Sequence, residues 1–379
     1  MTPSGSFPAW RTRLRRALLA WYRREARDLP WRRDPSPYRV WLSEIMLQQT
    51  QVATVRHHFT RFIARFPSIG ALAAAPEDEV LAAWQGLGYY RRARQLQAAA
   101  RVVMERHHGA FPLEVADALA LPGVGRYTAG AILSIAHRKP LPVVDGNVAR
   151  VLARLLAEDG PPEAARVQAR LWAAAAELVP RRDPGAWNQA LMELGALVCI
   201  PRRPDCPACP VAALCAARAL GRVDSIPPPR RRRRPPVVEV AAAWIDRGGG
   251  RLTLARRPSR GVLAGFWELP QADVAAAADP RAELTAVLAR MGAKRIAVGE
   301  ALARVEHSMF NRRAQLTAYS TRASWGKGAE VSVASPAELA DRPITTASRK
   351  LIRAVGLRTV GPRSVRLRTA TATSRNSRV

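Results

Sequence analysis

The chain has 379 residues, of which 48% are hydrophobic, so it is long and apolar enough for two globular domains and is not a disordered chain. Its 60 Lys and Arg against 30 Asp and Glu give a formal net charge of +30, which predicts a polyanionic partner: nucleic acid first, an anionic membrane surface second. Because no apolar run could cross a membrane and residues 1–16 contain no apolar signal core, we expect neither membrane insertion nor secretion.

Residues 10–220 are predicted to form an all-α domain. Apolar residues recur there at three- and four-residue spacing, as at Val148, Val151, Leu152 and Leu155. The periodicity breaks at proline and glycine steps such as 29–30, 66–67 and 121–123, which mark the ends of helices.

One acidic residue, Glu44, lies among apolar neighbours in the segment 38–52. A helical Glu next to Ser43 is ordinarily a surface residue. A carboxyl flanked by Trp41, Ile45 and Leu47, however, lies where burial could raise its pKa. Glu44 is therefore a candidate general acid.

The segment 121–130 is a tight glycine turn that opens onto a helix. Gly123 and Gly125 let the backbone approach a phosphate closely, and the helix that begins near Arg126 offers free amides and a favourable dipole. Such a hairpin can hold DNA backbone without reading sequence. The alternative is an ordinary turn between two helices.

Asp145 directly precedes an amphipathic segment, 146–155. There the helix dipole favours the ionised carboxylate. An N-cap is the common role of an Asp in this position, and a catalytic role is compatible with it.

The only four cysteines of the chain, Cys199, Cys206, Cys209 and Cys215, follow in one short stretch. Their uneven spacing, C-x6-C-x2-C-x5-C, favours a [4Fe–4S] cluster. Zinc is the second interpretation, because structural zinc sites more often show two C-x2-C pairs or a Cys and His mixture. Disulfides are the third, since the cysteines lie too close in sequence for ordinary disulfide loops.

Residues 221–236 end in a Pro- and Arg-rich run and are expected to be an extended linker. A second, α+β domain is predicted for 237–357, with strands at 237–244, 251–255 and 314–319 and a helix at 281–291. The Arg-, Ser- and Thr-rich tail, 358–379, is expected to be disordered.

Taken together, the motifs at 29–32, 38–52, 86–90, 121–130 and 145–148, followed by the cysteine spacing, resemble the MutY-type adenine DNA glycosylases. This family belongs to the helix–hairpin–helix superfamily of iron–sulfur DNA glycosylases. The resemblance runs collinearly from about residue 21 to residue 215 and continues more loosely through the second domain. It implies a helix–hairpin–helix glycosylase fold with a [4Fe–4S] loop at 199–215.

The resemblance also implies site residues. Glu44 would donate a proton to a flipped adenine, and Asp145 would stabilise the oxocarbenium-like sugar. Tyr127 and Asn147 would support the transition state and hold Asp145 and the water. Other positions match family residues of the adenine pocket, namely Leu29, Trp31, Arg32 and Gln189, or of the DNA-binding surface, namely Gln49, Tyr89, Gly123, Gly125, Arg126 and Ser308.

A closely related branch, the endonuclease III proteins, shares the hairpin, the Asp and the cluster. Its bifunctional members carry a Lys in the hairpin helix that forms a Schiff base with the opened sugar. The corresponding position here is Tyr127, so the resemblance implies a monofunctional glycosylase.

The segments 256–258 and 265–271 resemble the Nudix-like domain with which the family inspects the opposite strand. True Nudix hydrolases bind metal through several closely spaced glutamates, whereas 279–292 offers only Glu283, so we expect no pyrophosphatase activity. The family's Phe-Ser-His lesion reader is replaced by Met309, Phe310 and Asn311, and Ser308 could serve only after a register shift.

The expected function is removal of adenine mispaired with 8-oxoguanine or guanine. The expected partner is double-stranded DNA containing an adenine mispair, bound by a monomer in the cytoplasm, associated with the nucleoid. The cluster would have a structural and DNA-docking role. Two alternatives remain open at this stage: excision of thymine from G·T mismatches, and a non-catalytic iron–sulfur protein that binds DNA.

Overall fold

The computed structural model describes residues 6–228, 235–258, 261–309, 312–326 and 330–356. The chain divides into two compact units, Met1–Arg232 and Arg233–Val379, and this division falls within the expected linker 221–236. The tail expected at 358–379 lies outside the described residues.

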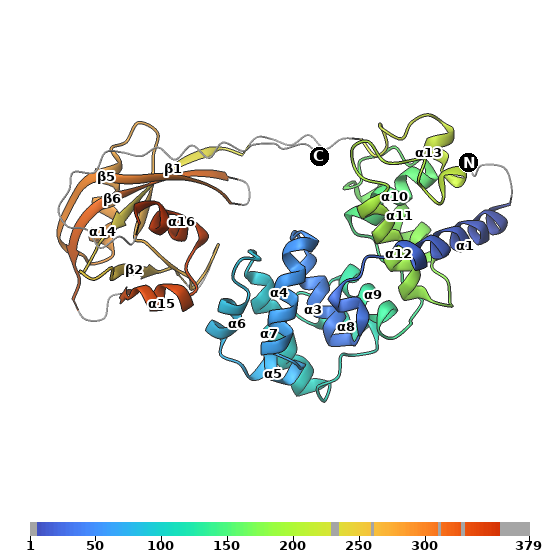
Figure 1. Ribbon diagram of the computed structural model, residues 1–379, viewed down its shortest axis with the longest axis horizontal. Coiled ribbons are helices and arrows are strands. Elements are labelled where there is room, and N and C mark those ends of the chain that lie inside the picture. Colours follow the sequence, from blue (N-terminus) through green and yellow to red (C-terminus); the bar gives the residue numbers. More distant parts are fainter. Residues whose placement is uncertain (1–5, 229–234, 259–260, 310–311, 327–329, 357–379) are drawn as a thin grey trace. The chain divides into compact units, whose positions relative to one another are not determined.

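The described part of the first unit is helical throughout, as the apolar periodicity predicts (Figure 1). Its elements are α1 (Phe7–Glu25), α2 (Pro30–Arg33), α3 (Pro37–Leu47), α4 (Val52–Arg65), α5 (Ile69–Ala74), α6 (Glu77–Ala83), α7 (Arg91–Arg106), α8 (Val115–Ala120), α9 (Arg126–Ile135), α10 (Gly146–Leu156), α11 (Ala165–Leu178), α12 (Pro184–Leu197), a short 3₁₀ turn (Ala212–Leu214) and α13 (Ala216–Ala219).

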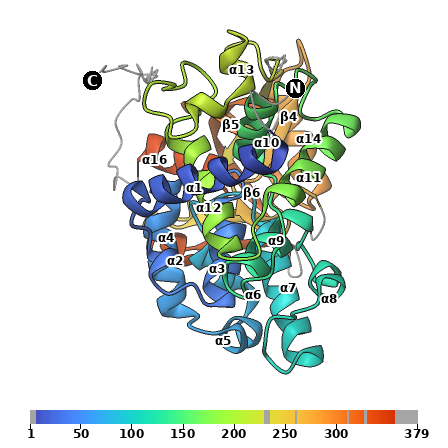
Figure 2. The same ribbon diagram turned by 90° about the vertical axis from the view of Figure 1, so that its right-hand side faces the viewer.

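Helix α9 joins two groups of helices in this unit. It packs against α3 on one side and α12 on the other, while α1 and α10 also pack on α12 (Figure 2). Gly185 makes a close approach between α9 and α12 possible, because a Cβ there would lie 2.6 Å from Ile135 Cα and 2.7 Å from Ser134 O. The residues that line the site described below therefore meet where α3, α9 and α12 converge.

The start of the expected linker is packed rather than extended. Ile226 is fully buried in the core formed by α1, α10, α11 and α12. Arg154 Nε donates hydrogen bonds to the carbonyl oxygens of Val223 (3.1 Å) and Ile226 (2.8 Å). Burial of an apolar side chain and satisfaction of these two carbonyls hold this segment to the helical unit.

The second unit is α+β. Its elements are β1 (Val237–Trp244), β2 (Leu252–Arg256), β3 (Trp267–Glu268), β4 (Gln271–Val274), α14 (Pro280–Arg290), β5 (Lys294–Met309), β6 (Arg312–Ser324), β7 (Val331–Ala334), α15 (Pro336–Asp341) and α16 (Thr346–Val355). One sheet has the order β4-β1-β6-β5 and the other the order β3-β2-β7. Strands β1 and β6 are parallel, and the other pairs are antiparallel.

Both faces of the four-stranded sheet are covered. Alternate residues of β1 point into two cores: Val240 and Ala242 into the one shared with β2 and α16, and Ala241 and Ala243 into the one shared with α14. The predicted strand at 314–319 is part of the longer strand β6, which pairs with β1 on one side and with β5 on the other. Strand β5 was not predicted; its alternation is interrupted by register shifts between Lys294 and Ala303.

Candidate active site

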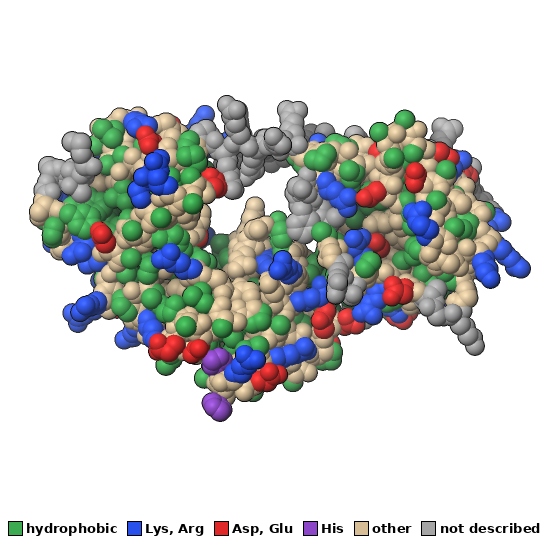
Figure 3. Space-filling model, turned by 180° about the vertical axis from the view of Figure 1, so that it is seen from behind, with side chains coloured by type: hydrophobic (Ala, Val, Ile, Leu, Met, Phe, Trp, Pro, Cys, Tyr) green, Lys and Arg blue, Asp and Glu red, His purple; other side chains and the backbone are tan. Residues whose placement is uncertain are grey.

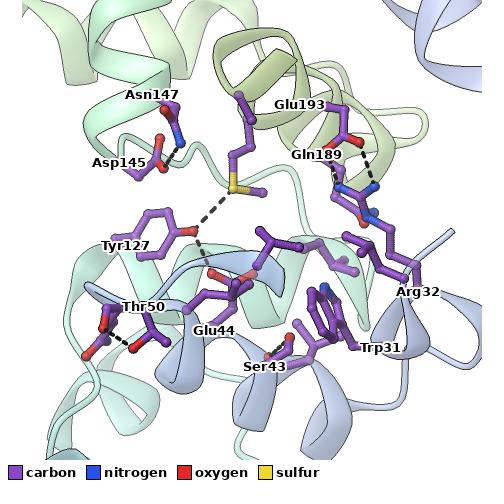
Figure 4. A pocket seen from close by; sticks show the side chains of 18 of the residues that line it. Trp31, Arg32, Ser43, Glu44, Thr50, Tyr127, Asp145, Asn147, Gln189 and Glu193 are labelled. Carbon is purple, nitrogen blue, oxygen red and sulfur yellow. Dashed lines mark hydrogen bonds and ion pairs between the residues drawn. The ribbon is translucent and has the colours of Figure 1, made fainter. Parts of the chain in front are cut away.

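A cavity of about 630 Å³ in the helical unit lies between α3, α9, α12 and the start of α10 (Figure 4). It brings together nine residues that the sequence singled out: Leu29, Trp31, Arg32, Glu44, Gln49, Tyr127, Asp145, Asn147 and Gln189. These residues lie between positions 29 and 189 of the sequence, so the fold assembles the site.

Glu44 is buried in this cavity, and the interpretation of it as a surface residue is wrong. Only 6% of Glu44 and 1% of Ser43 is exposed. The Tyr127 hydroxyl donates a hydrogen bond of 2.5 Å to Glu44 Oε2. Burial raises the pKa of Glu44 to about 7; the Tyr127 hydrogen bond acts against this rise, and the nearby charge of Asp145 adds to it. Near neutral pH, Glu44 can therefore hold a proton and give it up.

Asp145 is the N-cap of α10, as its position in the sequence predicts. Its Oδ1 accepts a hydrogen bond of 2.7 Å from Val148 N, and its Oδ2 accepts one of 3.2 Å from Asn147 Nδ2. Burial raises the pKa of Asp145 above its ordinary value, while these hydrogen bonds and the charge of Arg150 favour the ionised form. Glu44 and Asp145 thus have different hydrogen-bond donors: Glu44 accepts from a phenol, and Asp145 accepts from amide groups at a helix start.

Tyr127 lies between these two carboxyls in Figure 4. Besides its bond to Glu44, its hydroxyl lies 3.2 Å from Met192 Sδ. Burial first, and then the nearby carboxylates, raise the pKa of Tyr127 well above its ordinary value, so it remains a neutral hydrogen-bond donor.

Glu193 is a site residue that sequence reasoning missed. It is 1% exposed and lines the cavity from α12. Arg27 Nε and Nη2 donate to its two oxygens at 2.8 Å each, and Arg32 Nη2 donates at 2.8 Å. Burial alone would raise the pKa of Glu193, but these hydrogen bonds lower it to about 2. Glu193 therefore fixes the guanidinium of Arg32 at the cavity wall, and no local pattern could have shown this.

The remaining DNA-contact candidates do not line the cavity. Tyr89 is in the turn before α7, and Gly125 is the N-cap of α9. Gly123 has a φ of +76°, and a Cβ there would lie 2.8 Å from Gln95 Cβ, so the hairpin turn requires glycine at this position. The Arg126 guanidinium stacks 3.9 Å above the ring of Trp172.

Ser308 lies in the second unit, near the end of β5. It is exposed and pairs in register with Arg313 of β6. Of the altered reader segment, Phe310 and Asn311 lie outside the described residues.

The four cysteines line one small cavity together with Arg154. They form no disulfide. In the part of the chain that the structure describes, no three His, Cys, Asp or Glu side chains lie close enough to hold a single metal ion. Four thiols around a common space are a donor set that fits an iron–sulfur cluster. Arg154 Nη1 adds a hydrogen bond of 3.3 Å to Cys199 Sγ.

A second arginine of α10 joins the cysteine loop to the carboxyl site. Arg150 Nε donates to Cys199 O at 2.8 Å, and its Nη2 donates to Asn147 Oδ1 at 2.9 Å. Because Asn147 in turn donates to Asp145, the loop, Arg150 and Asp145 form one connected set of hydrogen bonds.

The raised pKa of Glu44 predicts a pH-dependent stability. Between its ordinary value of 4.5 and about 7, folded Glu44 keeps a proton that the unfolded chain loses. The free energy of unfolding should therefore fall by about 3 kcal/mol from this group as the pH rises through that range. Glu44→Gln cannot ionise and should lose this contribution when urea unfolding is compared at several pH values. The exposed Glu105→Gln is the matched control; a Glu44→Gln profile identical to that of the control would contradict the assignment.

Two family models match the chain. The HhH-GPD superfamily of base excision DNA repair proteins matches residues 42–177, and the NUDIX domain matches 241–354. In the described residues, no helix is long and apolar enough to cross a membrane.

Among curated proteins, the chain is 52% identical over 217 residues to human adenine DNA glycosylase, an alignment that covers 55% of this chain and 40% of the human protein. It is 43% identical over 311 residues to the rat adenine DNA glycosylase, covering 68% of this chain and 60% of the relative. The chain thus spans about half the length of these relatives.

Among solved structures, a thermostable thymine-DNA glycosylase matches with a TM-score of 0.52 and 28% identity, over 57% of this chain and 100% of the other. The helical fold, the appended NUDIX domain and the sequence identities agree with the resemblance seen in the motifs. The chain belongs to the MutY-type branch of the HhH-GPD superfamily of base excision DNA repair proteins.

Proposed function

We propose that this protein is a monofunctional glycosylase that removes adenine mispaired with 8-oxoguanine or guanine from double-stranded DNA. The observation that carries the proposal is the pair of carboxyls, Glu44 and Asp145, in one cavity with Tyr127 beside Glu44. The adenine specificity rests on the similarity to adenine DNA glycosylases and on the pocket positions Leu29, Trp31, Arg32 and Gln189.

The reaction begins when the adenine leaves the base stack, since its glycosidic bond is inaccessible inside the duplex. Protonated Glu44 donates its proton to a ring nitrogen of the flipped adenine. The C1′–N9 bond then breaks, and its electron pair leaves with the base. Tyr127 stabilises the carboxylate left on Glu44 through its hydroxyl, so the spent proton donor is not left as an unpaired buried charge.

Asp145 acts on the sugar that remains. Its carboxylate, oriented by Val148 N and Asn147 Nδ2, stabilises positive charge at C1′. A water adds to C1′ and its proton passes to the Glu44 carboxylate, which completes hydrolysis and restores the acid. Tyr127 occupies the position where a Schiff-base lysine would lie in bifunctional relatives, and a phenol cannot form that adduct.

DNA would bind through phosphate contacts of the glycine hairpin, Gly123 to Arg126, and through the excess of cationic side chains. On the face drawn in Figure 3, Lys and Arg side chains are spread over both units rather than gathered in one patch. Such contacts release counterions, so affinity should fall steeply with added salt. We propose that the protein works as a monomer on nucleoid DNA in the cytoplasm, with Ser308 as the residue of the second unit that contacts the opposite base.

We further propose that Cys199, Cys206, Cys209 and Cys215 hold a [4Fe–4S] cluster. Base removal needs neither electron transfer nor a Lewis acid, so the group would supply rigidity to the loop. Arg150 and Arg154 connect that loop to α10 and to the segment that ends at Ile226.

Single-turnover base release tests the function. Duplexes should carry A opposite 8-oxoguanine, G, C or T, with a T·G mismatch as control. We expect adenine release opposite 8-oxoguanine and G. Glu44→Gln should slow it by about 100- to 10,000-fold, the usual range for a general acid. Asp145→Asn should abolish it while DNA affinity, measured by fluorescence anisotropy, stays within a few-fold of the unsubstituted protein.

The outcomes separate the alternatives. Glu105→Gln, an exposed change, should leave the rates unaltered. Thymine release without adenine release would contradict the adenine assignment, and no base release from any duplex would favour a non-catalytic DNA-binding protein. Equal rates opposite 8-oxoguanine and G would mean that the replaced reader segment no longer selects the lesion.

Iron analysis tests the cofactor. Protein purified without oxygen should contain four irons per chain, with little zinc, and a broad visible absorption band. Cys206→Ser should lose iron and also DNA affinity, because the loop would no longer be held. Stoichiometric zinc in place of iron would contradict the cluster assignment.

A further inference from the structure

Two turns of the helical unit hold residues in the left-handed region of backbone space. Gln49 has a φ of +58° and Tyr89 a φ of +48°, and neither is a glycine. Such a conformation costs a non-glycine residue about 1–2 kcal/mol, so something in the structure must hold each turn in place. Both turns carry side chains that the sequence resemblance assigns to the DNA-binding surface.

The first turn is held by Arg92, a buried residue of α7. Its Nη1 donates hydrogen bonds to three carbonyl oxygens: Ile45 at 2.7 Å, Met46 at 2.8 Å and Gln48 at 2.5 Å. These carbonyls belong to the end of α3 and the residue just beyond it, where they lack partners within the helix.

The second turn is held by the other end of the same guanidinium. Arg92 Nη2 donates to Leu87 O at 3.0 Å, to Gly88 O at 3.1 Å and to Thr50 Oγ1 at 3.0 Å. The Thr50 hydroxyl donates to Leu87 O at 3.3 Å and so bridges the two turns directly. The guanidinium also lies 5.5 Å from the ring centroid of Tyr89.

The acceptors that the structure gives Arg92 are uncharged: five backbone carbonyls and one hydroxyl. A buried cation whose hydrogen-bond acceptors are all uncharged is a costly way to obtain stability. The planar fork of arginine does, however, fix the relative position of several acceptors at once, which a lysine cannot do. The arrangement therefore indicates a positioning role.

We propose that Arg92 is a positioning residue that locks the turns at Gln49 and Tyr89 to one another, so that both side chains enter the duplex together as the target base leaves the stack. The proposal rests on the base-excision function proposed above. If the two turns are already ordered before DNA binds, the entropy cost of ordering them is not incurred when the base flips.

The test compares Arg92→Lys with a matched control, Arg15→Lys. Arg15 also donates to three backbone carbonyls, those of Glu177, Leu178 and Val179, but these lie at the end of α11 and not in the turns at Gln49 and Tyr89. Arg92→Lys should lower single-turnover adenine release on the order of 100-fold, as expected for a misplaced group. It should also reduce the fluorescence increase of 2-aminopurine placed beside the target adenine, which reports unstacking. Arg15→Lys should change neither the rate of adenine release nor the 2-aminopurine fluorescence by more than a few-fold, even if it lowers the unfolding temperature as much as Arg92→Lys does.

A double-mutant cycle identifies the route of the effect. In a Gln49→Ala/Tyr89→Ala background, Arg92→Lys should cause little further loss, because residues that act as a unit are not additive. A full additional loss would overturn the proposal, since Arg92 would then act elsewhere, for instance through Glu44 on α3. An unaltered rate in folded Arg92→Lys would also overturn it.

If Arg92→Lys does not fold, Thr50→Val replaces it in the cycle. This change removes only the hydroxyl that bridges the two turns and should give a smaller loss with the same lack of additivity; an additive loss would again overturn the proposal. Failure of the proposed function is distinguishable, because the unsubstituted protein would then release no adenine at all.

Discussion

The hydrogen bond between the Tyr127 hydroxyl and the Glu44 carboxyl is the contact on which the rest of the site depends. It requires α3 and α9 to meet away from water, and the close approach of α12 at Gly185 completes the enclosure. Burial there raises the pKa of the Glu44 carboxyl and favours its protonated form. The hydrogen bond from the Tyr127 phenol stabilises the ionised form of Glu44 and limits this rise. The carboxyl can therefore exchange a proton near neutral pH.

The second carboxyl, Asp145, lies in the same cavity but in surroundings that favour its ionised form. Asp145 lies at a helix start, where amide donors and the dipole favour a negative charge. Two similar groups in one cavity are thereby given different environments, which is the arrangement that hydrolysis of a glycosidic bond requires. Glu193 is a third buried carboxyl, but its two arginines keep it ionised, and it orients Arg32.

The local parts of this site could be predicted from the sequence. The capping role of Asp145 follows from the residues beside it, and the burial of Glu44 follows from its apolar neighbours. The role of Glu193 could not be predicted, because its partners Arg27 and Arg32 lie 166 and 161 residues away. Arg92 escaped notice for a different reason: most of its acceptors are backbone carbonyls, which leave no mark in a sequence.

The fold shows the same division. Sequence patterns predicted the helical unit and, in the second unit, β1, β2, part of β6 and α14. They did not predict β5, where register shifts disturb the alternation, or the packing of Ile226 against α10. The position of Ile226 depends on Arg154 of α10, which lies 72 residues away in the chain.

The pH dependence of single-turnover adenine release tests the central claim most directly. If buried Glu44 is the proton donor, the rate should fall as the pH rises through about 7, and this fall should be absent in Glu44→Gln. DNA affinity should be measured over the same range, so that loss of binding is not mistaken for loss of the proton. A rate that is constant or rises through neutral pH in the folded, DNA-bound protein would contradict the account.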